Sequence, residues 1–120
     1  MSQKILIVED YDDVRQMMQF VLTSAGYEVL EASDGYEAVA MAVHERPDLI
    51  LMDIAMPVMD GIEATQTIRE HAELEDIPIV ALSAYGDLYR EKALAAGCND
   101  VVQKPVDFER LQKLVEQNVA

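Results

Sequence analysis

Short apolar runs alternate with longer amphipathic stretches along the 120-residue chain. Five of the runs are rich in Val, Ile and Leu, which favour strands. Strands buried on both faces form near-continuous hydrophobic runs, whereas strands with one exposed face alternate. We therefore predict five strands, at residues 4–8, 27–32, 48–52, 79–82 and 100–103.

The stretches between these runs carry apolar residues at helical spacing. In the first stretch Val14, Met18 and Val21 recur three or four positions apart, which is typical of an amphipathic helix. Gly26 is a candidate left-handed helix stop. The fourth predicted helix begins at Asp87, which we expect to cap it. The predicted helices span residues 12–25, 38–45, 62–70, 87–96 and 108–118.

Strands that alternate with helices require crossover connections, and such connections produce a parallel sheet with helices on both faces. The predicted fold is therefore α/β, a doubly wound five-stranded parallel sheet. A length of 120 residues suits one domain, and 51% hydrophobic residues can form a real core. We expect residues 1–120 to be a single domain.

The charge of the chain narrows the possible partners and locations. The net charge is −14, from 23 acidic and 9 basic residues. Such a charge repels phosphate backbones and anionic lipids, so we expect neither direct nucleic-acid binding nor membrane attachment. No apolar run approaches the roughly 20 residues of a membrane span. The single cysteine, Cys98, excludes an intramolecular disulfide and favours a reducing compartment, so we expect a cytoplasmic protein.

Polar residues follow four of the five predicted strands. Glu9 and Asp10 follow the first, Asp53 the third, Ser83 the fourth and Lys104 the fifth. The carboxyl ends of parallel strands lie at one edge of the sheet, where open α/β sheets bind their ligands. Three carboxylates, a hydroxyl and a lysine are therefore expected to converge there.

This set of groups suits one kind of chemistry. Three neighbouring carboxylates repel, so they either raise each other's pKa values or bind a cation. Oxygen ligands without His or Cys favour Mg²⁺ over Zn²⁺. Lys104 adds a positive charge and Ser83 a hydroxyl donor. These groups could stabilise transfer of a phosphoryl group onto a carboxylate oxygen.

Several motifs resemble those of response regulator receiver domains of two-component signalling. The motifs are "VED" at residues 8–10, "LILMDIAMPVMDG" at 49–61, "ALSA" at 81–84 and "QKP" at 103–105. They occur in the order that the family has, and the resemblance extends through nearly the whole chain. It implies a flavodoxin-like strand order of 2-1-3-4-5 and a single receiver domain over residues 1–120.

The resemblance also implies roles for individual residues. Asp53 matches the phosphoacceptor, which takes its phosphoryl group from a histidine kinase or a histidine phosphotransfer protein. Ser83 matches the switch hydroxyl, and Lys104 matches the lysine that contacts the phosphoryl group. The Lys104–Pro105 bond is expected to be cis. The implied Mg²⁺ ligands are Glu9, Asp10, Asp53 and the backbone carbonyl of Ala55.

The chain departs from the family pattern at Val101, where relatives usually have Tyr or Phe. Valine has no ring to move, so the family's aromatic switching is expected to be absent or relocated. Tyr85 could substitute for it, or could simply be an exposed tyrosine that packs along a loop. Neither Ala55 nor Tyr85 carries an amide or carboxylate that would position an attacking water. We therefore hypothesise slow self-dephosphorylation.

Three functions remain open from the sequence. The first is a phosphorylation-dependent switch that catalyses only its own phosphorylation and dephosphorylation. Its downstream target would bind the helix from Asp87 to Ala96, the strand around Val101 and the last helix. The second is a scaffold of the same fold with impaired switching. The third is a phosphatase of the haloacid dehalogenase type, although Ala55 stands where that class needs a second aspartate. The chain is expected to be either a stand-alone regulator or part of a longer protein.

Overall fold

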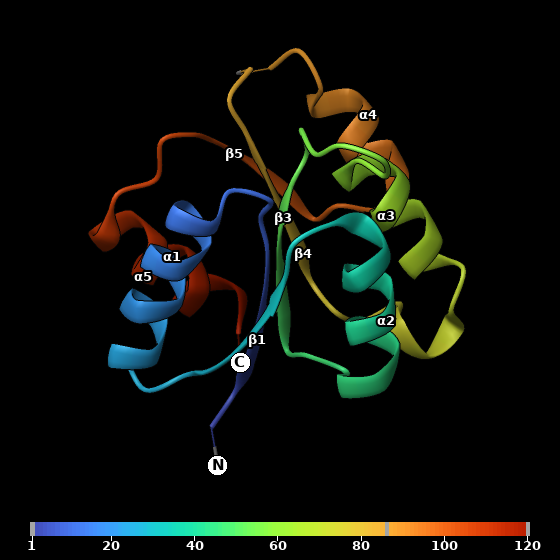
Figure 1. The fold of residues 1–120 in the computed structure, drawn as a ribbon. Helices are drawn as coiled ribbons and strands as arrows, with labels where there is room; N and C mark the ends of the chain where they lie inside the picture. Colours follow the sequence, from blue (N-terminus) through green and yellow to red (C-terminus); the bar gives the residue numbers. More distant parts are fainter. Residues whose placement is uncertain (1, 86, 120) are drawn as a thin grey trace.

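A computed structural model describes residues 2–85 and 87–119 of the chain (Figure 1). The strands are β1 (Lys4–Val8), β2 (Glu28–Ala32), β3 (Leu49–Asp53), β4 (Ile79–Ser83) and β5 (Asp100–Gln103). The helices are α1 (Asp12–Ser24), α2 (Gly35–Glu45), α3 (Gly61–Arg69), α4 (Arg90–Ala96) and α5 (Phe108–Asn118), with a short 3-10 helix η1 (Ala72–Leu74) after α3. Within the described part of the chain, no helix has the length and apolar character to cross a membrane.

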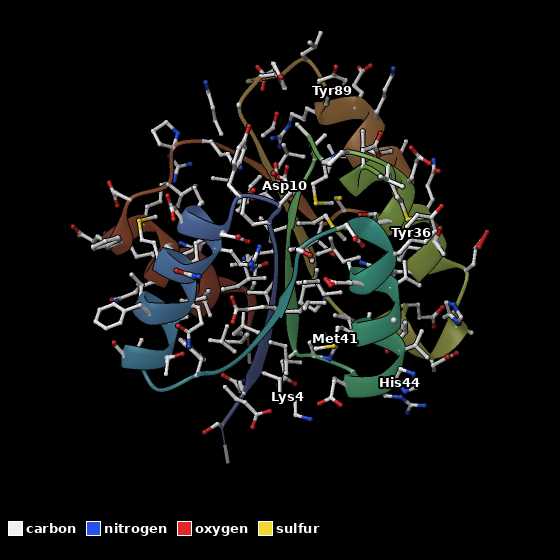
Figure 2. The ribbon with its side chains drawn as sticks, viewed as in Figure 1. Lys4, Asp10, Tyr36, Met41, His44 and Tyr89 are labelled. Atoms are coloured by element: carbon white, nitrogen blue, oxygen red, sulfur yellow. The ribbon has the colours of Figure 1, made fainter. Side chains whose placement is uncertain are left out.

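The five strands form one parallel sheet in the order β2-β1-β3-β4-β5, which confirms the predicted fold class and strand order. Helices α1 and α5 cover one face of the sheet, and α2, α3 and α4 cover the other (Figure 1). Lys4 and Asp10 lie at opposite ends of β1, so Figure 2 shows which edge of the sheet holds the carboxyl ends of the strands.

The alternation of side chains along each strand divides the core into two clusters. Ile5 and Ile7 of β1 pack with α1 and α5, whereas Leu6 and Val8 pack on the opposite face. Strands β3 and β4 are buried at every position. Because a central parallel strand has helices on both faces, it needs apolar residues throughout, and this explains the continuous runs in the sequence.

Aspartates are the N-cap residues of three helices. The side chains of Asp34, Asp60 and Asp107 accept hydrogen bonds from backbone N–H groups three residues on, at 2.8, 2.9 and 2.8 Å, and so cap α2, α3 and α5. The cap at Asp34 explains why α2 begins at Gly35, three positions before the predicted start. Gly26 has a φ of 100° after α1, as predicted.

The prediction that Asp87 caps the fourth helix is wrong. Helix α4 begins at Arg90, and no side-chain hydrogen bond caps it within the described residues. Asp87 instead lies in a turn, where its carbonyl oxygen accepts from the Arg90 N–H at 3.1 Å. The amphipathic spacing extends across this turn, and only the tertiary structure shows where the helix itself begins.

Two backbone features shape the loops next to the carboxyl edge. The Lys104–Pro105 peptide bond is cis, as expected. Gly61 begins α3 directly against the end of β3, where an added Cβ would collide with the Asp53 carbonyl oxygen and lie 2.9 Å from Met52 Cγ. A glycine is therefore needed for α3 to pack this closely against the strand that carries Asp53.

Candidate functional site

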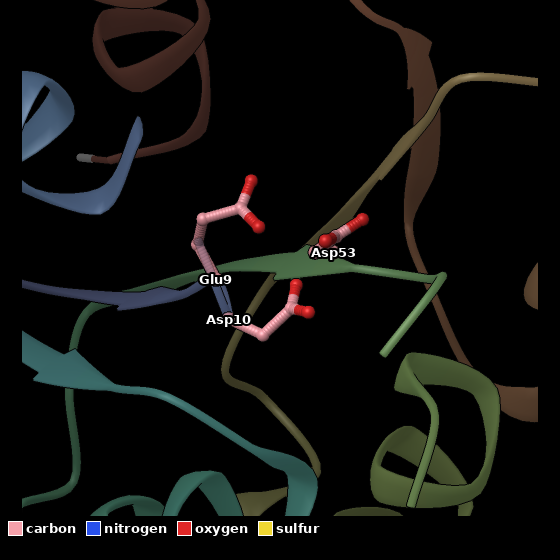
Figure 3. A group of neighbouring side chains, drawn as sticks. All are labelled: Glu9, Asp10 and Asp53. Carbon is pink, nitrogen blue, oxygen red and sulfur yellow. The ribbon is translucent and has the colours of Figure 1, made fainter. Parts of the chain in front are cut away.

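Two adjacent strands bring three carboxylates together at the carboxyl edge of the sheet. Val8 of β1 pairs with Met52 of β3, so the residues that follow them, Glu9 and Asp53, are neighbours. Asp10 comes next along the chain from Glu9. One carboxylate oxygen from each acid lies within 4.8 Å of the others. Figure 3 shows the Glu9 and Asp10 side chains extending from the end of β1 toward Asp53.

Lys104, which directly follows the edge strand β5, also reaches this acid cluster. Its Nζ lies 2.7 Å from Glu9 Oε1 and 3.3 Å from Asp53 Oδ1. Its backbone N–H donates to the Ser83 carbonyl oxygen at 2.7 Å, which fixes the start of the loop after β5. One ammonium group therefore contacts two of the three carboxylates.

The electrostatics of the cluster are uneven. Glu9 and Asp53 are 1% and 3% exposed, so burial opposes charge on both. For Glu9, hydrogen bonding with Asp53 and Lys104 outweighs burial and lowers the pKa. Burial, reinforced by Glu9 and only partly offset by Lys104, raises the pKa of Asp53 to about 7. Lys104 therefore pairs mainly with a charged Glu9, and Asp53 titrates near neutral pH.

Asp10 is the least compensated of the three acids. Burial and the neighbouring Glu9 raise its pKa. Its Oδ1 is buried and has no hydrogen-bond partner among the described residues. A buried carboxylate oxygen without a partner is costly, and a cation would satisfy it. An all-oxygen donor set with this unpartnered atom fits Mg²⁺.

Ser83 and Ala55 lie beside the cluster. Ser83 ends β4, pairs with Gln103 of β5 and is 1% exposed, and its hydroxyl accepts from the Tyr85 N–H at 3.1 Å. Ala55 is exposed, and its N–H donates to Asp53 Oδ1 at 3.3 Å. Glu9, Asp10, Asp53 and Lys104 therefore form one cluster, with Ser83 and Ala55 on the segments that frame it.

Sequence reasoning missed Arg15 of α1. Its guanidinium donates to the Glu9 carbonyl oxygen at 2.9 Å, directly behind the acid cluster. A single arginine on an amphipathic helix resembles any solvated surface residue. Only the packing of α1 against the end of β1 shows its contact with the site.

The region of the unusual Val101 is occupied by other contacts. Val101 is 9% exposed, and its carbonyl oxygen accepts from Arg90 Nη1 at 3.2 Å. Tyr85 is 55% exposed, and its ring packs edge-on against Tyr89 with centroids 5.6 Å apart. Tyr85 therefore lies in the loop after β4, as expected, with an exposed ring paired to another tyrosine.

An apolar groove of about 360 Å³ opens beside Lys104. Met17 and Met18 of α1 line one side, and the segment from Lys104 through Pro105 to Val106 lines another. Phe108, at the start of α5, adds an exposed ring next to it. The groove gives the acid cluster an apolar border on the α1 and α5 side.

Comparisons with known proteins agree with this geometry. The model of the family described as response regulator receiver domain matches residues 5–116. The polar-differentiation response regulator DivK of Brucella anthropi is 33% identical over 119 residues, which cover 97% of this chain and 95% of that protein.

Two solved structures are similar over almost the whole chain. The chemotaxis protein CheY4 of Vibrio cholerae is 34% identical with a TM-score of 0.94, covering 99% of this chain and 100% of that one. The receiver domain of the sensor histidine kinase PA1611 from Pseudomonas aeruginosa is 39% identical with a TM-score of 0.89, covering 98% of each chain. That structure has a magnesium ion coordinated in its active site cleft.

Proposed function

The chain belongs to the response regulator receiver domain family, and from that premise we propose that Asp53 is the residue that accepts the phosphoryl group. Receiver domains are signalling switches of two-component systems rather than classical enzymes. The only reactions that we propose for this chain are its own phosphorylation and dephosphorylation. The supporting observation is that the Asp53 carboxylate ends the central strand β3 within 4.8 Å of oxygens of both Glu9 and Asp10 and 3.3 Å from Lys104 Nζ.

The proposed reaction transfers a phosphoryl group from a phosphohistidine to Asp53. A carboxylate oxygen of Asp53 attacks the phosphorus, and the bond from phosphorus to the imidazole nitrogen breaks, with its electron pair left on that nitrogen. Asp53 must be deprotonated to attack, and its pKa of about 7 makes this state accessible at neutral pH. Lys104, 3.3 Å from Asp53, stabilises the negative charge on the phosphoryl oxygens.

We propose that Glu9, Asp10, Asp53 and the carbonyl of Ala55 hold Mg²⁺. The unpartnered Oδ1 of Asp10 and the magnesium ion in the similar PA1611 receiver domain support this assignment. When bound, the ion would neutralise charge on the carboxylates and on the incoming phosphoryl group. The hydroxyl of Ser83, which accepts from the Tyr85 N–H, would donate its own O–H to the phosphoryl group.

Receiver domains interact with histidine kinases or histidine phosphotransfer proteins. For this chain we propose that the phosphodonor protein docks on the apolar groove between α1 and the loop after β5. Lys104 lines this groove and contacts Asp53, so a donor bound there would be next to the acceptor. Exposed Phe108 and Met17 offer apolar contact area at its border.

The downstream target would bind the surface formed by α4, β5 around Val101, and α5. Residues 1–120 would act as one receiver domain in the cytoplasm, without direct contact to nucleic acid or membrane. The single, buried Cys98 and the net charge of −14 support that location and those limits.

Neither alternative function gains support. A haloacid dehalogenase type phosphatase needs an acid two residues after the acceptor, and Ala55 has none. A scaffold without phosphorylation would have no need for an acid pair, an acceptor and a lysine in contact.

Intact-mass measurement after incubation with Mg²⁺ and acetyl phosphate tests the proposal. We expect a single phosphoryl adduct on the wild-type protein and none on Asp53→Asn. The matched control is Asp87→Asn, an exposed aspartate in the turn before α4, which should take up the adduct normally. An adduct on Asp53→Asn, or none on the wild type, would contradict the assignment.

A further inference from the structure

The backbone of Glu9 is held on both sides by contacts outside the acid cluster. The Glu9 N–H donates to the Ala32 carbonyl oxygen of β2 at 3.1 Å. The Glu9 carbonyl oxygen accepts from Arg15 Nη1 at 2.9 Å. Since this carbonyl belongs to the peptide that joins the two acids, Arg15 restrains the orientation of Asp10 as well as that of Glu9.

Arg15 is itself fixed by two further contacts. Its Nη2 lies 2.6 Å from Asp12 Oδ1 in the first turn of α1, and its Nε lies 3.3 Å from Glu31 Oε1 of β2. The side chain is only 14% exposed, although both partners are much more open to solvent. One guanidinium therefore joins the end of β1, the start of α1 and the edge strand β2.

These contacts indicate a positioning role. The carboxylates of Asp12 and Glu31 neutralise the Arg15 guanidinium locally. Its interaction with Glu9 is therefore mainly a directed hydrogen bond to the carbonyl oxygen. Asp10 Oδ1 has no partner of its own among the described residues, and repulsion from the other acids would favour its rotation toward solvent. The orientation of the Asp10 side chain toward Asp53 therefore depends on the backbone of Asp10.

We propose that Arg15 is a positioning residue that orients the Glu9–Asp10 peptide and so preorganises the acid cluster for a divalent cation. The inference rests on the proposed function, because it assigns the cation to that same cluster. Arg15 contacts neither the cation nor the phosphoryl group. It acts through the main chain, as residues behind metal ligands commonly do.

Titration of Mg²⁺ alone into the protein, followed by amide NMR spectra, tests this role. In Arg15→Gln and Arg15→Lys we expect Mg²⁺ affinity to fall about tenfold, because neither side chain reproduces the fork that reaches Glu9, Asp12 and Glu31 together. In the metal-free proteins, hydrogen exchange at the Asp10 and Tyr11 amides should become faster. Unchanged Mg²⁺ affinity and unchanged exchange in both variants would overturn the inference.

Two control variants separate positioning from general stability. Glu31→Gln removes the negative charge that faces Arg15 Nε but leaves the hydrogen bond from Arg15 to the Glu9 carbonyl. Mg²⁺ affinity should therefore change less than twofold. Val115→Ala opens a cavity in the core beneath α5, so it should lower the unfolding midpoint and leave Mg²⁺ affinity unchanged. If Val115→Ala weakened Mg²⁺ binding as much as Arg15→Gln, the role of Arg15 would be merely structural.

The readouts also distinguish this inference from the proposed function. A wild-type protein that takes up no phosphoryl group would contradict the function of Asp53. The Mg²⁺ affinity and amide exchange of the Arg15 variants would still decide the role of Arg15, because neither measurement depends on phosphorylation.

Discussion

Two loops at the same edge of the sheet differ sharply in how they are held. In the loop after β1, residues 9–11, Glu9 is hydrogen-bonded to three separate parts of the fold. Its N–H bonds to β2, its carbonyl oxygen to α1, and its carboxylate to Lys104 after β5. The loop between β4 and α4 is largely exposed, and Tyr85 and Leu88 expose 55% and 70% of their surface. Within its described residues, its helix starts without a side-chain cap.

The difference separates two requirements of a switch. Phosphoryl transfer needs charges fixed in place before the reaction, because reorientation would cost free energy during it. A signal needs a segment with few contacts, whose conformation a modest free energy can change. The restraints lie on the acid side, and the β4–α4 loop is attached to the site through the bond between Ser83 and Tyr85. Substitutions on the two sides of this contrast should therefore have different effects.

The largest effect is expected from Lys104→Met. This change removes the only side-chain cation that contacts the carboxylates of Glu9 and Asp53 among the described residues, so phosphorylation by acetyl phosphate should slow roughly 10³-fold. Time-resolved intact mass measures the rate. Lys113→Met removes an exposed ion pair with Glu109 on α5 and should leave the rate unchanged. Equal rates for the wild type and Lys104→Met would refute the role of Lys104.

Gly61→Ala should produce the largest loss of stability. The added methyl group meets the Asp53 backbone, which cannot move without shifting β3, so we expect a loss of about 3 kcal/mol in the free energy of unfolding. Urea denaturation measures it. The contrasting variant is Leu88→Ala in the exposed β4–α4 loop, which should change stability by less than about 0.5 kcal/mol. A Gly61→Ala protein as stable as the wild type would mean that the close approach is relieved cheaply.

Asp53→Asn should stabilise the metal-free protein in a pH-dependent way. The pKa of Asp53 is raised from its ordinary value of 3.8 to about 7, so the folded state binds the proton more tightly than the unfolded state. Stability therefore falls as pH rises between these two values, and the cost is fully present above pH 7. Asparagine carries no charge, so the variant should gain about 2 kcal/mol at pH 8 and much less at pH 5.

Urea denaturation at both pH values, without metal, measures this gain. Asp87→Asn, in the exposed loop, should show no comparable pH dependence. A gain for Asp53→Asn that is equal at pH 5 and pH 8 would show that desolvation of a charged Asp53 is not its cause.

The smallest effect is expected from Tyr85→Ala. No group at Ala55 or Tyr85 positions a water, so the wild-type phosphoprotein should lose its phosphate slowly. Without the exposed Tyr85 ring beside the site, loss of the phosphate should become about threefold faster. A tenfold change in rate corresponds to about 1.4 kcal/mol, so this threefold change corresponds to less than that. Tyr36→Ala on α2, with a similarly exposed ring far from Tyr89, is the control (Figure 2). Rapid loss from the wild type that Tyr85→Ala does not alter would contradict the hypothesis.

Much of the candidate site could be predicted because its chemistry lies in short segments. Glu9, Asp10 and Asp53 each follow or end a hydrophobic run, and parallel strands place such ends together. Arg15 and the need for glycine at position 61 could not be predicted from pattern alone. Both depend on atoms from other elements, the Glu9 carbonyl and the Asp53 carbonyl, whose positions no local pattern contains.

The helix starts show the same division. Asp107 precedes the last helix and caps it, as its chemistry allows, whereas Asp87 is the same residue type and caps no helix among the residues that the structure describes. The difference arises because the loop after β4 must first follow its own turns before α4 can pack on the sheet. Capping preference states which residues can begin a helix, and packing decides which of them do.

The strand runs, the parallel α/β sheet and the gathering of acidic residues at one edge could all be predicted from the residues, because they follow from local periodicity and from the geometry of parallel strands. How the charges are shared among those residues depends on the folded arrangement. Lys104 is 95 residues from Glu9 along the chain, yet bonds to it at 2.7 Å. The titration of Asp53 near pH 7 arises from burial and from the charges around it, and neither is a property of the residue alone.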